Sequence, residues 1–89
     1  MMEPSEIVAI LKSKIDGAEV LVEDLTGTKD HFQAVVVSPA FAGKSMIEQH
    51  QLVYAALKEQ MVEAIHALTL KTYTPQEWQA QSAAPRGIS

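Results

Sequence analysis

The chain contains no cysteine, and this absence excludes several kinds of chemistry. Its 89 residues also include only 4 glycines, 4 prolines and few aromatic side chains, at 6% of the total. Without a thiol the protein can form no disulfide, carry no cysteine nucleophile and build no cysteine-ligated metal site. Any metal bound here must be held by histidine, by carboxylates or by ligands from another molecule.

Long apolar runs are absent as well. Residues 1–10 have neither the basic start nor the apolar stretch of a signal peptide, and no segment approaches the roughly 20 apolar residues of a membrane span. We therefore expect a soluble, intracellular protein of the cytoplasm with no membrane partner.

Basic charge is scarce and dispersed. The 7 lysine and arginine residues stand singly along the chain, and the formal net charge is −4. Nucleic-acid binders usually gather basic residues into a patch, so tight non-specific binding to phosphate backbones is disfavoured. Four acidic residues do cluster, and we interpret them as a solvated strand edge and loop: Glu19, Glu23, Asp24 and Asp30.

The length predicts one small domain over residues 1–82, followed by a flexible C-terminal tail at 83–89. A chain of this size buries only about 60–65% of its unfolded surface, enough for one two-layer core without a deep cavity. Function is then expected at a surface or at a site shared with a partner.

The N-terminal half predicts a helix followed by a hairpin. In residues 4–15, Pro4 suits a first helical turn, and Ile7, Leu11 and Ile15 recur on one helical face. Gly17 then ends the helix. Residues 18–25 and 31–38 are typical of two strands, close enough in sequence to pair as an antiparallel hairpin.

The C-terminal half predicts one or two helices, a third strand and a short last helix. Ser45 and Glu48 have the spacing of a capping box at the start of residues 45–64. Residues 65–74 are typical of a strand, and Thr74 with Pro75 opens the final helix. The helical block has apolar residues and a histidine in steps of three and four, namely Ile47, His50, Tyr54, Leu57 and Met61.

This order of elements predicts an α+β fold. Because a helical crossover precedes the third strand, we expect a three-stranded mixed sheet in which that strand is parallel to its neighbour. The helices would pack on one face of the sheet, giving the αββααβ order of a class II KH-like fold with a short C-terminal helix. A fold of this kind does not by itself give a function.

The segment AGKS at residues 42–45 is not a phosphate-binding loop. The full motif requires a glycine five residues before Gly43, and that position is Ser38. Gly43 instead allows the chain to turn into the helix that Ser45 caps. Phe41 precedes the cap as a hydrophobic anchor.

The three histidines, His31, His50 and His66, do not have metal-ligand spacing. His66 is in phase with Leu68 and Leu70 on the third strand, which favours a packed, hydrogen-bonded side chain. At the head of a strand it could also present one ring nitrogen as an iron or zinc ligand. Such a ligand would form only part of a site, completed by another chain.

Two segments together resemble the BolA family. These are F-x-G-K-S…H-Q-L-V-Y-x-x-L at residues 41–57 and I-H-A-L-x-L-K-T-Y-T-P-x-E-W at residues 65–78. The resemblance implies a class II KH-like fold, no known enzymatic activity and partnership with CGFS monothiol glutaredoxins. With such a partner and glutathione, members hold a bridging [2Fe-2S] cluster. The isolated protein is expected to carry none and to be a monomer or weak dimer.

The resemblance also assigns roles to residues. His66 corresponds to the family's C-terminal cluster ligand, and His31 is the candidate in the first hairpin loop for the second ligand, with His50 as the other histidine. Phe41 and His66 are expected at the partner interface. Some members are described as DNA-binding transcriptional regulators, which would use Gly43, Lys44 and Ser45. Gln49 stands where the family usually has arginine.

Overall fold

The computed structural model describes residues 3–27, 31–65 and 67–83. The elements follow the predicted αββααβ order and end in a short helix, which confirms the α+β class. Of the tail predicted at 83–89, all but Ala83 lies outside the described residues. The elements are α1 (Pro4–Lys14), β1 (Glu19–Asp24), β2 (His31–Val37), the 3-10 turn η1 (Pro39–Phe41), α2 (Met46–Ala56), α3 (Lys58–Glu63), β3 (Ala67–Tyr73) and α4 (Pro75–Ala83).

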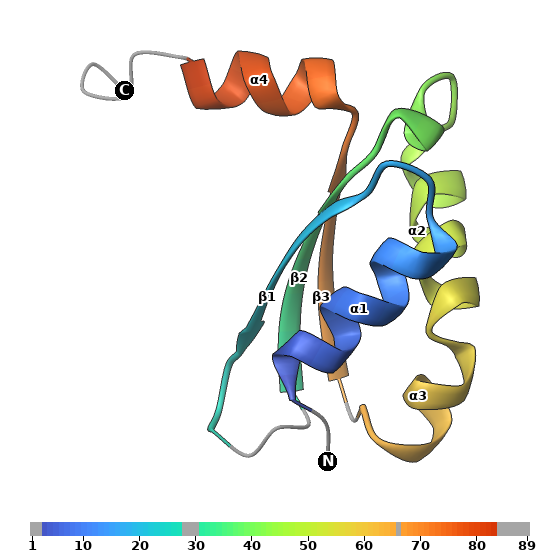
Figure 1. The fold of residues 1–89 in the computed structure, drawn as a ribbon, viewed down its shortest axis with the longest axis vertical. Coiled ribbons are helices and arrows are strands. Elements are labelled where there is room, and N and C mark those ends of the chain that lie inside the picture. The colour runs from blue at the N-terminus through green and yellow to red at the C-terminus, as the bar shows by residue number, and fades with distance from the viewer. Residues whose placement is uncertain (1–2, 28–30, 66, 84–89) are drawn as a thin grey trace.

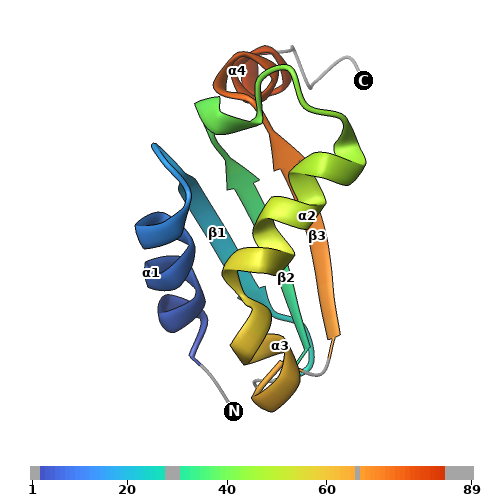
Figure 2. The ribbon, with the colours of Figure 1, turned by 90° about the vertical axis from the view of Figure 1, so that its right-hand side faces the viewer.

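The sheet has the strand order β1-β2-β3. β1 pairs antiparallel with β2, and β3 pairs parallel with β2. The helices α1, α2 and α3 cover one face of the sheet, whereas α4 projects beyond the end of the strands on the other side (Figures 1 and 2). None of the described helices is long and apolar enough to cross a membrane. One face of the sheet is thus covered and the other is largely open.

The first helix is anchored by its apolar face. Pro4 occupies the first turn and Glu3 forms a reciprocal capping box with Glu6, which satisfies amides at the helix start. Ile7 and Leu11 are fully buried against the sheet and α2. Burial of two such side chains stabilises the fold by about 1.5–3 kcal/mol each.

The turn after α1 is joined to the turn after β2. Gly17 has a φ of +64°, and a Cβ at this position would lie 3.1 Å from the ring of Pro39. The hydroxyl of buried Ser38 donates a 2.6 Å hydrogen bond to the carbonyl of Asp16 and accepts one from the amide of Ala40. Glycine is needed here for both its backbone conformation and its lack of a side chain.

The predicted buried face of the long helical block is wrong in part. Ile47 is 71% exposed and Tyr54 is 38% exposed. The side chains of α2 that reach the core are instead Gln49, Val53 and Ala56. Leu57 is buried as expected, but it ends α2, and the chain restarts there as α3. Because α2 is apolar on more than one side, its sequence periodicity does not identify the face that packs.

This correction predicts a contrast between two substitutions. Leu57→Ala should lower the free energy of unfolding by about 2–5 kcal/mol, because a fully buried leucine leaves a cavity. Ile47→Ala should change it by less than about 0.5 kcal/mol, because this side chain is already in water. Urea unfolding followed by circular dichroism measures both, and equal effects would contradict the assigned face.

Candidate functional site

His31 opens β2 at one end of the sheet. Its side chain is half-buried, and its backbone carbonyl accepts a 2.8 Å hydrogen bond from the amide of Leu25. In the parallel register of β2 and β3, His31 is the direct neighbour of Ala67, the first residue of β3. An imidazole and the start of the third strand therefore share one end of the sheet.

The hairpin connection leaves this end through a tight turn. A side-chain oxygen of Asp24 accepts hydrogen bonds from the amides of Thr26 and Gly27, at 3.3 and 3.0 Å. Such Asx turns fix the direction of the chain, and the φ of +80° at Gly27 suits glycine. The start of the connection is thus held beside His31, whereas residues 28–30 lie outside the described residues.

The structure separates His50 from His31. Gln49, which precedes His50 on α2, accepts a 2.7 Å hydrogen bond from the hydroxyl of Thr72. Thr72 is five residues beyond Ala67 on β3 (72 − 67 = 5), or about 16 Å along the strand. His50 therefore belongs to the opposite end of the sheet. His66, the other predicted ligand, lies outside the described residues.

The end of the sheet at His31 and Ala67 offers few metal donors among the described residues. Within residues 3–27, 31–65 and 67–83, no three histidine, aspartate or glutamate side chains are grouped so that they could hold a metal ion. An imidazole such as that of His31 is a suitable type of ligand for iron, including iron in a [2Fe-2S] cluster. The donor types present fit a shared cluster whose remaining ligands come from elsewhere.

The predicted role of Phe41 at a partner interface is wrong. Its side chain is fully buried within the core cluster, with Phe32 and Val53. A side chain without exposed surface cannot contact another protein while the fold is intact. Phe41 does act as the predicted hydrophobic anchor, because it fixes the loop that leads into α2.

The loop from Gly43 to Ser45 is exposed and presents one cation. Gly43 has a φ of +76°, and no other atom lies near the position of an added Cβ. Lys44 follows it in the exposed part of the loop. The groove beside Lys44 has a volume of about 330 Å³ and is also lined by Met46, Thr72 and Glu77.

Ser45 is occupied in capping α2. Its hydroxyl accepts a hydrogen bond from the amide of Glu48, and its own amide donates to the Glu48 carboxylate at 2.8 Å. Hydrogen bonds from the backbone and side chain of Ser45 lower the pKa of Glu48 from its ordinary value of 4.5, and Lys44 adds a smaller lowering. The carboxylate is therefore charged at neutral pH and offsets the positive charge of Lys44.

Gln49 ties the loop to the sheet. Its side-chain nitrogen donates to the carbonyls of Phe41 and Lys44, at 3.3 and 3.0 Å. Its side-chain oxygen accepts from Thr72 on β3. Gln49 is only 8% exposed, so its side-chain oxygen and nitrogen depend on these partners, rather than on water, for hydrogen bonds. The Gln49 amide is a structural clamp on the residue 41–45 loop.

Sequence reasoning treated Gln49 only as a missing arginine and did not find this clamp. A signal was present, because residues 49, 53 and 56 follow helical spacing and form the buried face of α2. A polar residue in phase with Val53 and Ala56 indicates a buried group that needs partners. Those partners lie on the loop and on β3, and their identity could not be read from the sequence.

Comparison with known proteins gives consistent similarities. Residues 4–77 match the family described as BolA-like protein. The chain is 40% identical over 84 residues to Protein BOLA2 of Arabidopsis thaliana, covering 92% of this chain and 89% of that protein. It is 41% identical over 56 residues to the DNA-binding transcriptional regulator BolA of Haemophilus influenzae, covering 63% of this chain and 54% of that protein. It thus spans only about half the length of that regulator.

A solved structure of a bolA protein homologue from Coxiella burnetii is similar throughout. It superposes with a TM-score of 0.78 at 38% sequence identity, covering 89% of this chain and 99% of that chain. The similarity therefore extends over most of the chain.

The clamp predicts a stability loss that a neighbouring glutamine does not share. Gln49→Ala leaves the Thr72 hydroxyl and two loop carbonyls without this partner, and should lower the free energy of unfolding by about 1–3 kcal/mol. Gln51→Ala, at an exposed position of the same helix, is the matched control and should be close to neutral. Equal losses in urea unfolding would show that the amide bonds contribute nothing.

Proposed function

The chain belongs to the BolA-like family, and on that premise we propose that it is a non-enzymatic adaptor of the cytoplasm. It binds a CGFS monothiol glutaredoxin, and the two proteins hold a bridging [2Fe-2S] cluster together with glutathione. The adaptor then acts in iron–sulfur cluster trafficking or in iron and redox regulation.

The observation that carries the proposal is the pairing of His31 with Ala67. His66 directly precedes Ala67 in the sequence, and adjacent strands lie about 4.8 Å apart. This adjacency supports His31 and His66 as ligands at one end of the sheet, and it favours His31 over His50 as the second ligand.

The ligand types support a shared cluster over a resident one. Cysteine thiolates are the usual ligands of [2Fe-2S] iron, and this chain has none. Two imidazoles would leave the remaining positions to thiolates of the glutaredoxin and of glutathione. When bound, such a cluster can accept an electron, and replacement of thiolate by imidazole raises its reduction potential.

The histidines should differ in a reconstitution experiment. The protein is mixed with a CGFS monothiol glutaredoxin, glutathione, iron and sulfide without oxygen, and the cluster is followed by visible circular dichroism. His66→Ala and His31→Ala should each shorten the cluster lifetime by at least roughly tenfold, since even outer-shell partners of metal ligands contribute about 10–100-fold.

His50→Ala is the matched control, because His50 belongs to the other end of the sheet. It should leave the spectrum and lifetime unchanged. If the cluster has the same spectrum and lifetime in all three variants as in the unaltered protein, ligation by these histidines is excluded.

The exposed loop supports a second candidate function, the binding of DNA. Similar proteins are named DNA-binding transcriptional regulators, and here Gly43 and Lys44 stand exposed at the start of α2. The nearby Glu48 carboxylate and the net charge of −4 weaken any phosphate contact. This candidate therefore ranks second.

Salt dependence discriminates the two functions. If Lys44 contacts a phosphate, Lys44→Glu should weaken binding to all duplex sequences and reduce the slope of log K against log salt by about one. Lys58→Glu, on an exposed position of α3, is the control and should keep that slope. No retention of duplex DNA by the unaltered protein at low salt would remove this candidate.

A further inference from the structure

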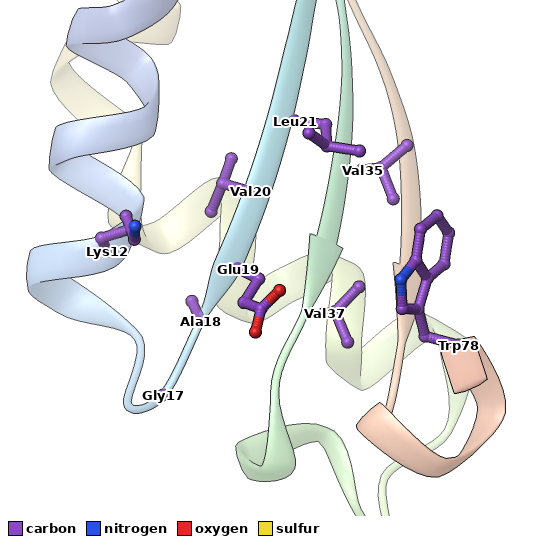
Figure 3. Close-up of a pocket in the computed structure, with 9 residues that line it drawn as sticks. All are labelled: Lys12, Gly17, Ala18, Glu19, Val20, Leu21, Val35, Val37 and Trp78. Carbon is purple, nitrogen blue, oxygen red and sulfur yellow. The ribbon is translucent and has the colours of Figure 1, made fainter. Parts of the chain in front are cut away.

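A cavity among the described residues runs along the free edge of the sheet. β1 is paired with β2 on one side only, since the strand order is β1-β2-β3. The cavity has a volume of about 470 Å³ and is lined by the consecutive residues Gly17, Ala18, Glu19, Val20 and Leu21. Successive residues of a strand point to opposite faces. Because the lining includes side chains on both sides of β1, the cavity includes the free edge of the strand (Figure 3).

The cavity extends from the edge onto both faces. Lys12 of α1 lines it on the covered side, whereas Val35, Val37 and Trp78 line it on the open side (Figure 3). Trp78 comes from α4 and packs against the ring of Tyr73 with a centroid distance of 5.3 Å. The free edge of β1 is therefore reachable from solvent and is bordered by apolar side chains.

The side chains on the open side of β1 alternate in character. Glu19, Leu21 and Glu23 are all exposed, with Leu21 at 60%. Residues two apart on a strand share a face, so an apolar side chain stands between two carboxylates on this surface. A strand placed beside β1 would meet these three side chains in turn.

Charge disfavours a second copy of this chain as that strand. Antiparallel pairing of β1 with the β1 of another copy, centred on Leu21, would place Glu19 directly opposite Glu23 twice. Like charges directly opposite each other destabilise a strand pair. The same acidic pair favours a strand that has an apolar residue with one basic residue two positions before it and another two positions after it.

We propose that the free edge of β1 is a docking site for an extended segment of a partner protein, with an apolar residue between two basic residues at alternate positions. The segment pairs antiparallel with β1, so that its apolar residue lies beside Leu21 and its basic residues lie beside Glu19 and Glu23. Lys12 borders the other face of the added strand. It favours an acidic side chain opposite Val20.

The test uses the full chain without glutaredoxin or cluster, so its result is independent of the proposed cluster function. The probe is the blocked peptide Thr-Lys-Thr-Val-Glu-Lys-Thr, and its partner is the charge-reversed peptide Thr-Glu-Thr-Val-Lys-Glu-Thr. Binding is followed by amide chemical shifts and hydrogen exchange. The first peptide should shift the β1 amides and slow their exchange. The second should bind about tenfold more weakly, because two opposite-charge cross-strand pairs become like-charge pairs.

Two charge-reversal variants locate the contact. Glu19→Lys with Glu23→Lys should exchange the preference between the two peptides. Glu59→Lys with Glu63→Lys makes the same change in net charge on exposed positions of α3 and should leave the preference unchanged. Equal loss of binding in both variants would show general attraction to an acidic protein and overturn the proposal.

Two other results would also overturn it. One is peptide binding that leaves the exchange of the β1 amides unaltered, because docking onto the open face forms no strand pair. The other is slowed exchange at β1 that grows with protein concentration in the absence of peptide, because the occupant would then be a second copy.

Discussion

The parallel pairing of β2 with β3 is the constraint on which the rest of this structure depends. Parallel neighbours cannot be joined by a tight turn, because the chain must return to the other end of the sheet before the second strand begins. Here α2 and α3 make that return, on the same face as α1 (Figure 2). The crossover therefore determines which face is buried, and it leaves the opposite face to α4 alone.

The same constraint separates the candidate functional residues between the two ends of the sheet. Parallel strands start at the same end, so His31 at the start of β2 lies beside Ala67 at the start of β3. The loop with Lys44 follows the other end of β2, and Gln49 ties it to Thr72 near the far end of β3. The histidine end and the cationic loop are thus about a full strand length apart, roughly 20 Å. A partner at one end leaves the other accessible.

Local signals predicted the elements well because each has a local physical cause. The capping box at Ser45 is formed as predicted, and Thr74 opens the final helix with a second one. Gly17 adopts a positive φ in the turn that follows α1. Residues 18–25 and 31–38 were correctly predicted to contain the two strands of an antiparallel hairpin. The resemblance of two short motifs correctly identified the family.

The same patterns could not predict which helix face packs against the sheet or which distant residues come into contact. α2 carries apolar residues on two sides, and the packed side was decided by the position of β3 and the polar clamp of Gln49, not by the stripe through Ile47 and Tyr54. Phe41 was recognised as an anchor, but its complete burial follows from contacts with distant residues such as Phe32 and Val53. The candidate cluster ligands were indicated by motif, whereas the separation of His50 from His31 required the sheet register.

The acidic residues of β1 illustrate how one device can serve two purposes. An unpaired strand edge attracts other strands, and charged side chains along it are a common protection against self-association. The sequence indicated no more than a solvated edge for Glu19 and Glu23. The structure adds an exposed Leu21 between them and an adjoining cavity, features that protection alone does not require. Glu19 and Glu23 repel the same acidic pair on another copy of β1, and they attract a strand with basic residues at the matching positions. The arrangement that keeps this edge unpaired in the isolated protein therefore also selects the strand that can pair with it.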